Sequence, residues 1–177
     1  DAAEWYKAIN HDNNNNHNFK LGTDFFLNSK HTVGFIVDGR NAQGPWENLS
    51  RTEISSLDKP EEVESILVAS NSQPQNRTNL NFNLNYRFAD TLGHELTVDA
   101  NRGTYRYRAD SYQPNRYYNA TEQELLSENI YRNNTPTDID ITILKADWEQ
   151  NLWKGKLGIG FKMNNVETDN IFDFFNV

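Results

Sequence analysis

The sequence predicts an all-β fold of antiparallel, up-and-down strands, and three observations support this class. Apolar and polar residues alternate along several stretches, as they do on a strand with one apolar and one polar face. Three short connections rich in turn residues are typical of hairpins: residues 28–31, 90–93 and 153–156. These turns begin 62 and 63 residues apart, so the connections at the opposite ends of the strands must be much longer.

The strongest strand prediction covers residues 79–88. Its even positions are Leu, Phe, Leu, Tyr and Phe, whereas its odd positions are four Asn and one Arg. The same alternation returns, more weakly, in three other stretches: residues 33–38, 96–101 and 157–164. A further strand is expected over residues 139–148, but its apolar phase slips by one at Leu144. That slip indicates a bulge or a change of environment along the strand.

The composition excludes several classes of protein. The longest unbroken apolar run is four residues, Ile66–Ala69, whereas a membrane-spanning helix needs about 20. A net charge of −8 argues against nucleic acid as a partner, because a protein that binds it presents a basic face to phosphate. The absence of cysteine removes disulfides and thiolate chemistry. The mean hydropathy is only −0.85 and 26 residues are asparagine, but 12% of the residues are aromatic, which indicates an ordered chain.

Long strands with tight turns at one end only are typical of a transmembrane β-barrel, whose strands turn one face to lipid and one to the lumen. We therefore expect part of a barrel, with about six to eight antiparallel strands. The residues expected to face lipid are Leu80, Phe82, Leu84, Leu96, Val98, Leu157, Ile159 and Phe161. The residues expected to face the lumen are Asn81, Asn83, Asn85, Asp99 and Asn101.

The polar stretches between the predicted strands are expected to be long outer loops. They cover Asn41–Gln75 and Asp110–Asn134, and their aromatic residues and asparagines suit a nutrient such as a carbohydrate or a peptide. A short helix is expected within the first loop, over Asp58–Ile66, because Pro60 suits the first turn of a helix.

Four blocks of the sequence resemble the TonB-dependent-receptor-like outer membrane β-barrel family in their order and spacing: residues 21–34, 81–88, 90–96 and 131–141. The resemblance spans about residues 18–175. It implies a place in the outer membrane of a Gram-negative bacterium and a role in nutrient uptake. The implied partners are outer membrane lipid, a plug domain of the same protein, TonB and the nutrient. It also implies that residues 1–177 are a single segment of the barrel domain, without the upstream plug and the remaining strands.

No motif predicts an enzyme, and we expect no catalytic residue, no cofactor and no metal site. His94-Glu95 begins like a zinc-protease motif but lacks the second histidine. Asp138 and Asp140 share one face of a predicted strand and leave three interpretations open. They form the acid-base pair of a hydrolase, contribute oxygen ligands to calcium, or stay ionised in water or beside Arg102, Arg106 and Arg108. The last interpretation is preferred, because charged side chains on an exposed strand are ordinarily hydrated or paired.

The main alternative to a barrel is a secreted, soluble β-sandwich that binds carbohydrate. It accounts for the polarity and the acidic charge without a membrane. The two folds differ in one respect that a structure tests directly: in a sandwich Leu80, Phe82 and Leu84 pack against a second sheet, and in a barrel they point outward.

Overall fold

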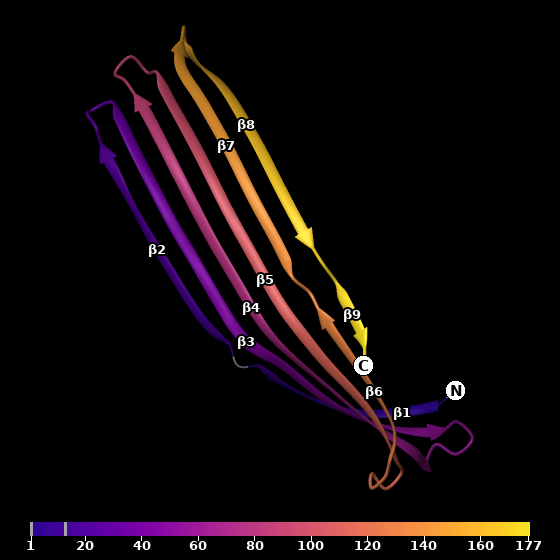
Figure 1. Cartoon of the computed structure of the whole chain (residues 1–177). Helices are drawn as coiled ribbons and strands as arrows, with labels where there is room; N and C mark the ends of the chain where they lie inside the picture. The colour runs from indigo at the N-terminus through magenta and orange to yellow at the C-terminus, as the bar shows by residue number, and fades with distance from the viewer. Residues whose placement is uncertain (1, 13) are drawn as a thin grey trace.

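One antiparallel sheet of nine strands makes up the computed structural model, which describes residues 2–12 and 14–177 (Figure 1). In chain order the strands are β1 (Ala2–Asp12), β2 (Asn15–Phe26), β3 (His31–Ser56), β4 (Val63–Ala89), β5 (Glu95–Asn119), β6 (Leu125–Asn134), β7 (Thr137–Leu152), β8 (Gly155–Asn170) and β9 (Asp173–Asn176). All hydrogen-bonded neighbours among them are antiparallel. The predicted all-β class is therefore confirmed.

The nine strands lie on six lines across the sheet, because three of the lines carry two strands each. β1 and β2 both pair with β3, and β6 and β7 both pair with β5. On the last line, β8 pairs with β7 and β9 pairs with β6. Hairpins join successive lines, so the sheet is an up-and-down meander. Six lines agree with the predicted range of six to eight strands.

The three predicted hairpin turns are present, and all lie at the same end of the sheet, at the upper left of Figure 1. They join β2 to β3, β4 to β5 and β7 to β8. The side chains of Asn28 and Asp90 each accept two backbone N–H groups within their turns, at 2.9 to 3.1 Å. Gly93 closes the second turn with a φ of +88°, a conformation that favours glycine.

The two predicted outer loops are wrong, because both stretches are mostly strand. β3 and β4 pair without a break from His31 opposite Phe88 to Ile54 opposite Ser65, which leaves only residues 57–62 as a connection. The short helix expected over Asp58–Ile66 is not formed; those residues make a turn and the start of β4. Polar side chains suit a strand that water touches on both faces, so their polarity did not mark the end of the sheet.

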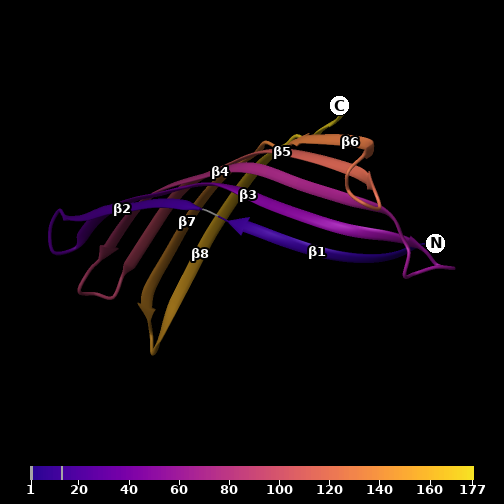
Figure 2. The ribbon, with the colours of Figure 1, turned by 90° about the horizontal axis from the view of Figure 1, so that it is seen from below.

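The sheet is arched but open (Figure 2). It has almost no buried core. Among residues 14–177, the buried apolar side chains are those of Ile66, Ala109 and Pro114. Leu80, Phe82 and Leu84 are each 45% exposed and meet no second sheet within the described residues, so a β-sandwich does not fit. No helix in this part of the chain is long and apolar enough to cross a membrane.

Three prolines lie in a line across the sheet, at the level where strands are interrupted. Pro45 and Pro74 are register partners on β3 and β4, and Pro136 lies between β6 and β7. Because proline has no backbone N–H, the hydrogen-bond ladder loses donors along this line. We call the part next to the tight turns the turn-side half (residues 15–43, 76–108 and 137–170) and the part beyond the prolines the far half (residues 2–12, 46–73, 110–134 and 173–176).

Candidate functional site

One face of the turn-side half is lined by amide and carboxylate side chains. We call it the asparagine face, and it carries all five residues predicted to face a lumen: Asn81, Asn83, Asn85, Asp99 and Asn101. Asn83 donates to Oδ1 of Asn101 (2.6 Å), Asn85 donates to Oδ1 of Asn83 (3.3 Å), and Asn81 donates to Oδ2 of Asp38 (2.9 Å). A Cβ at Gly34 would lie 2.1 Å from Oδ1 of Asp24 and 2.7 Å from Oδ1 of Asn85, so only glycine leaves room for this network.

The opposite face of the turn-side half is apolar, and we call it the leucine face. It carries all eight residues predicted to face lipid: Leu80, Phe82, Leu84, Leu96, Val98, Leu157, Ile159 and Phe161. One row across five lines consists of Val33, Tyr86, Val98, Ala146 and Phe161. The strip continues onto β2 through Phe19, Leu21 and Phe25, which are 53 to 64% exposed. These three were absent from the predicted set, although their two-residue spacing was a usable signal.

The far edge of the apolar strip runs obliquely across the strands. Val37 and Phe82 are register partners on β3 and β4, but the next residues in the same row are Arg102 on β5 and Thr142 on β7. The strip therefore ends earlier on β5 and β7 than on β3 and β4. Strands tilted by about 35–45° to a membrane normal produce such an offset, because one plane crosses neighbouring strands at different registers.

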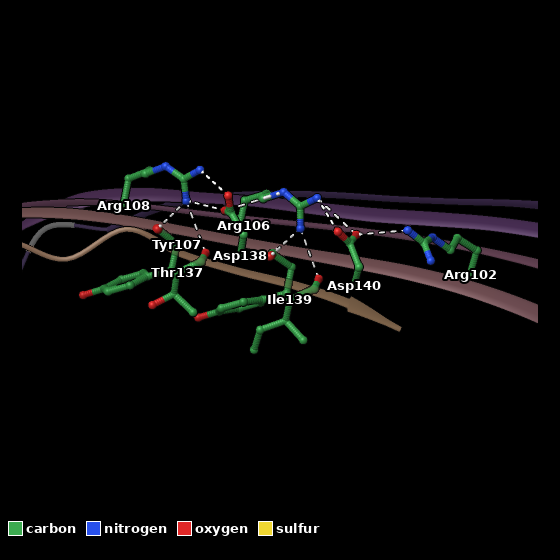
Figure 3. Close-up of polar contacts among 9 residues, drawn as sticks. Arg102, Arg106, Tyr107, Arg108, Thr137, Asp138, Ile139 and Asp140 are labelled. Atoms are coloured by element: carbon green, nitrogen blue, oxygen red, sulfur yellow. Dashed lines mark hydrogen bonds and ion pairs between the residues drawn. The ribbon is translucent and has the colours of Figure 1, made fainter. Parts of the chain in front are cut away.

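Arginines and aspartates alternate along the leucine face where the apolar strip ends (Figure 3). Arg108 donates to both oxygens of Asp138 (2.5 and 2.9 Å), and Arg106 donates to both oxygens of Asp140 (3.1 and 2.9 Å). Arg102 lies 3.6 Å from Oδ1 of Asp140. We call these five side chains the arginine ladder. Both aspartates are therefore paired with these arginines, as the preferred interpretation predicted.

The arginine ladder is built for ion pairing rather than for proton transfer. The hydrogen bond from Arg108 lowers the pKa of Asp138 below its usual value, and desolvation opposes this only in part. A general acid needs a raised pKa instead, so Asp138 is a poor acid at neutral pH. In the part of the chain that the structure describes, no group of three or more His, Cys, Asp or Glu side chains is arranged to hold a metal ion.

The predicted phase slip on β7 is a change of environment and not a bulge. The register of β7 with β5 and with β8 is continuous from Thr137 to Glu149. Ile139, Ile141 and Ile143 consequently lie on the asparagine face, whereas Leu144 begins the apolar positions of the leucine face. Figure 3 shows the same alternation: Ile139 and Tyr107 point away from the side that carries the arginine ladder.

His94 holds the turn between β4 and β5 and belongs to no group of described side chains that could bind a metal ion. Its Nδ1 lies 2.8 Å from Oδ2 of Asp90, and its ring stacks on Trp148 with 5.8 Å between ring centroids. The hydrogen bonds of Asp90, first of all the one from the His94 side chain, lower its pKa to about 2. The contacts of His94 thus give it a structural role in the turn.

Comparison with known proteins assigns the chain to a family. The model of the outer membrane protein beta-barrel family matches residues 87–177, just over half of the chain. The matched region contains β5 to β9 and the last residues of β4, and so includes the arginine ladder. No curated protein matches the chain.

Proposed function

This chain belongs to the outer membrane protein beta-barrel family, and we propose that it forms part of the barrel wall of a TonB-dependent-type receptor that takes up a nutrient. Its location is the outer membrane. The observation that carries the proposal is the asymmetry of the meander. Its three tight turns lie at one end, and at the other end the β3–β4 hairpin continues far beyond the apolar strip.

The lengths of the strands support a receptor rather than a minimal barrel. A strand needs about 9–11 residues to cross a bilayer, whereas β3 has 26 residues and β4 has 27. At about 3.3 Å per residue, more than half of each strand extends outside the membrane. Tall, stiff hairpins of this kind offer a large surface for capturing a solute before it enters the lumen.

The two faces of the turn-side half support the proposed orientation. We assign the leucine face to lipid, because a strip of exposed Leu, Phe, Val and Ile costs free energy in water but not in hydrocarbon. We assign the asparagine face to the lumen, where Asn and Asp side chains contact water or a plug domain. The six lines do not close on one another, and a barrel of this type needs at least eight strands. In the proposal, further strands of the parent protein close the barrel, and its plug domain fills the lumen.

The proposed role is not enzymatic and needs no cofactor. The aspartates that suit acid-base chemistry are held by arginines in the ladder. The remaining partners in the proposal are TonB on the periplasmic side and a nutrient of carbohydrate or peptide type. The proposal also places the protein in a Gram-negative bacterium.

Binding of TonB tests the proposal directly. The full-length gene product, purified in detergent micelles, should bind the periplasmic domain of TonB in a saturable manner by isothermal titration calorimetry. A version that retains the barrel but lacks the segment before it is the matched control and should not bind. An outer membrane protein of normal stability that fails to bind TonB would contradict the receptor type and leave only the barrel.

A further inference from the structure

Two of the nine arginines, Arg40 and Arg77, form no ion pair with any described carboxylate. Each of the other seven has a carboxylate oxygen within 3.6 Å: Arg51, Arg87, Arg102, Arg106, Arg108, Arg116 and Arg132. Acidic residues outnumber basic ones by eight in this chain, so a shortage of carboxylates is not the cause. The exception of Arg40 and Arg77 therefore needs a local explanation.

Arg40 and Arg77 lie close together on the asparagine face. Arg40 is the register partner of Asn79, and Ala42 is the register partner of Arg77, so the two arginines occupy diagonal positions on β3 and β4. Two cavities of about 200 Å³ each share Arg40, Ala42 and Arg77 in their walls. Pockets for drug-sized ligands measure about 300–1,000 Å³, so each cavity suits one part of a ligand.

Neutral groups hold both guanidinium groups in place without cancelling their charge. Arg40 donates twice to Oδ1 of Asn16 (3.1 and 2.8 Å), and Arg77 donates to Oε1 of Gln75 (2.8 Å). The guanidinium of Arg77 also lies 5.3 Å from the ring centroid of Tyr107. An arginine has five N–H donors, so both side chains keep donors that point to no described acceptor. The site is thus ordered and positively charged.

The rest of the lining suits a ligand with rings and hydroxyl groups. Trp46 lies in the wall of one cavity and Tyr105 in the wall of the other, and flat aromatic side chains pack against the faces of sugar rings. Oδ1 of Asn79 is buried and has no hydrogen-bond partner among the described residues. A buried acceptor without a donor is costly, which favours a ligand hydroxyl at this wall.

We propose that Arg40 and Arg77 form a binding subsite for the carboxylate groups of an acidic oligosaccharide. Arginine pairs with carboxylates through two parallel N–H···O bonds, and two arginines on one face match carboxylates on successive sugars. The inference deepens the proposed function, since it rests on the assignment of the asparagine face to the lumen. Asp38, two residues before Arg40 on the same face, accepts a hydrogen bond from Asn81 (2.9 Å) and leaves both arginines free for the ligand.

Calorimetric titration of the full-length product in detergent micelles tests the subsite. The probes are trigalacturonate, which carries carboxylates, and maltotriose, a neutral trisaccharide of similar size. Trigalacturonate should bind about tenfold more tightly than maltotriose or better, and the difference should shrink as salt is raised. The double variant Arg40→Gln/Arg77→Gln should lose about tenfold or more in affinity for trigalacturonate. Arg87→Gln is the matched control, because Arg87 lies on the same face of β4 but is paired with Glu95 (2.7 Å).

Three outcomes would overturn the inference: no binding of trigalacturonate, equal binding of both trisaccharides, or an equal loss in the Arg87→Gln control. Normal binding by the double variant would overturn it as well, and a lower unfolding temperature of that variant would then assign the two arginines to a carboxylate of the plug. The result is separable from the test of the receptor type. A protein that binds TonB but not trigalacturonate refutes the subsite alone, and one that binds trigalacturonate but not TonB refutes the receptor type alone.

Discussion

The turn-side half and the far half of the sheet are built from the same lines in the same register, yet their side chains follow different rules. On β4, residues 79–88 alternate strictly between the two faces, with Leu80, Phe82 and Leu84 exposed on one of them. Residues 63–73 of the same strand carry a mixture of Ser, Asn, Gln, Glu and aliphatic residues. The backbone pairing of β4 with β3 does not change between the two parts. The surroundings of a strand, and not its secondary structure, therefore change along its length.

The side chains on the leucine-face side of the sheet, which we call outward, are stabilised in different ways in the two halves. In the turn-side half they are large and apolar, and burying such surface contributes about 25 cal/mol per Å² when lipid replaces water around it. In the far half the outward groups include ion pairs between neighbouring strands, such as Arg116 with Glu128 (2.7 Å) and Arg132 with Asp110. The hydrogen bond from Arg132 lowers the pKa of Asp110, which keeps that pair charged at neutral pH. The first set of side chains suits hydrocarbon and the second suits water.

The largest expected effect is that of a charge on the leucine face. Leu84→Arg should lower the free energy of unfolding by about 2–4 kcal/mol, because Leu84 lies in the middle of the apolar strip on β4 and an arginine near the bilayer midplane is poorly solvated. The measurement is urea unfolding of the full-length product from phospholipid vesicles.

Ser72→Arg is the matched control for Leu84→Arg. Ser72 lies on β4 and on the same side of the sheet, since it is an even number of residues away, but in the far half. Its substitution should change the free energy of unfolding by no more than about 0.5 kcal/mol. Equal losses in the two variants would end the distinction between the halves.

A smaller effect is expected at the arginine ladder, where the apolar strip ends. Asp140→Asn removes the charge that Arg106 contacts at 2.9 Å and Arg102 at 3.6 Å. The side chains of Arg106 and Asp140 are 36% and 23% exposed, so solvent screens the pair and the loss should be no more than about 1 kcal/mol. The same unfolding assay should give a smaller loss at about 1 M salt, where the screening length is about 3 Å.

Glu64→Gln serves as the control for the ladder, because Glu64 is exposed on β4 and makes no ion pair with a described residue. It should show no salt-dependent loss. A loss in Asp140→Asn that is independent of salt would mean that the ladder acts through packing and not through charge.

The smallest effect concerns the tight turn between β4 and β5. The pKa of Asp90 is lowered from 3.8 to about 2, first of all by the hydrogen bond from His94. A carboxyl whose pKa is lowered on folding stabilises the fold above its unfolded pKa, and this contribution is lost as pH falls through the folded value near 2.

Carboxyl chemical shifts of Asp90, followed by NMR from pH 5 to about 1.5, measure this pKa directly. In His94→Leu the midpoint should move up toward the ordinary aspartate value, while the backbone hydrogen bonds to Asp90 keep it from reaching that value. An unchanged Asp90 midpoint in His94→Leu would remove His94 as the cause.

Sequence patterns predicted the turn-side half well and the far half badly, for one physical reason. Alternation is visible only where the two faces suit different media, as the apolar Leu80 and the polar Asn81 do. Beyond the prolines polar side chains occur on both faces, so residues 46–73 carry no alternation and resemble a loop. Their strand pairing follows from the register that the turn-side half imposes on the same backbone.

The candidate sites divide in the same manner. The asparagine face and the leucine face could be predicted, because membership of a face depends only on odd or even position along one strand. The sequence also named the aspartates and arginines of the ladder, but not which arginine pairs with which aspartate. Those pairings and the pair Arg40 and Arg77 depend on register between strands far apart in sequence. Asp140 and Arg106 are 34 residues apart and meet only because β5 and β7 pair with Asp140 opposite Thr104.

By itself, the sequence determined the strand class, the three tight turns and the two faces of the turn-side half, since these follow from local periodicity and turn chemistry. Only the tertiary structure decided how far the hairpins extend, which side of β7 its isoleucines occupy, and which arginines find a carboxylate. Each of those depends on the cross-strand register, a property of pairs of strands that no single stretch of sequence contains.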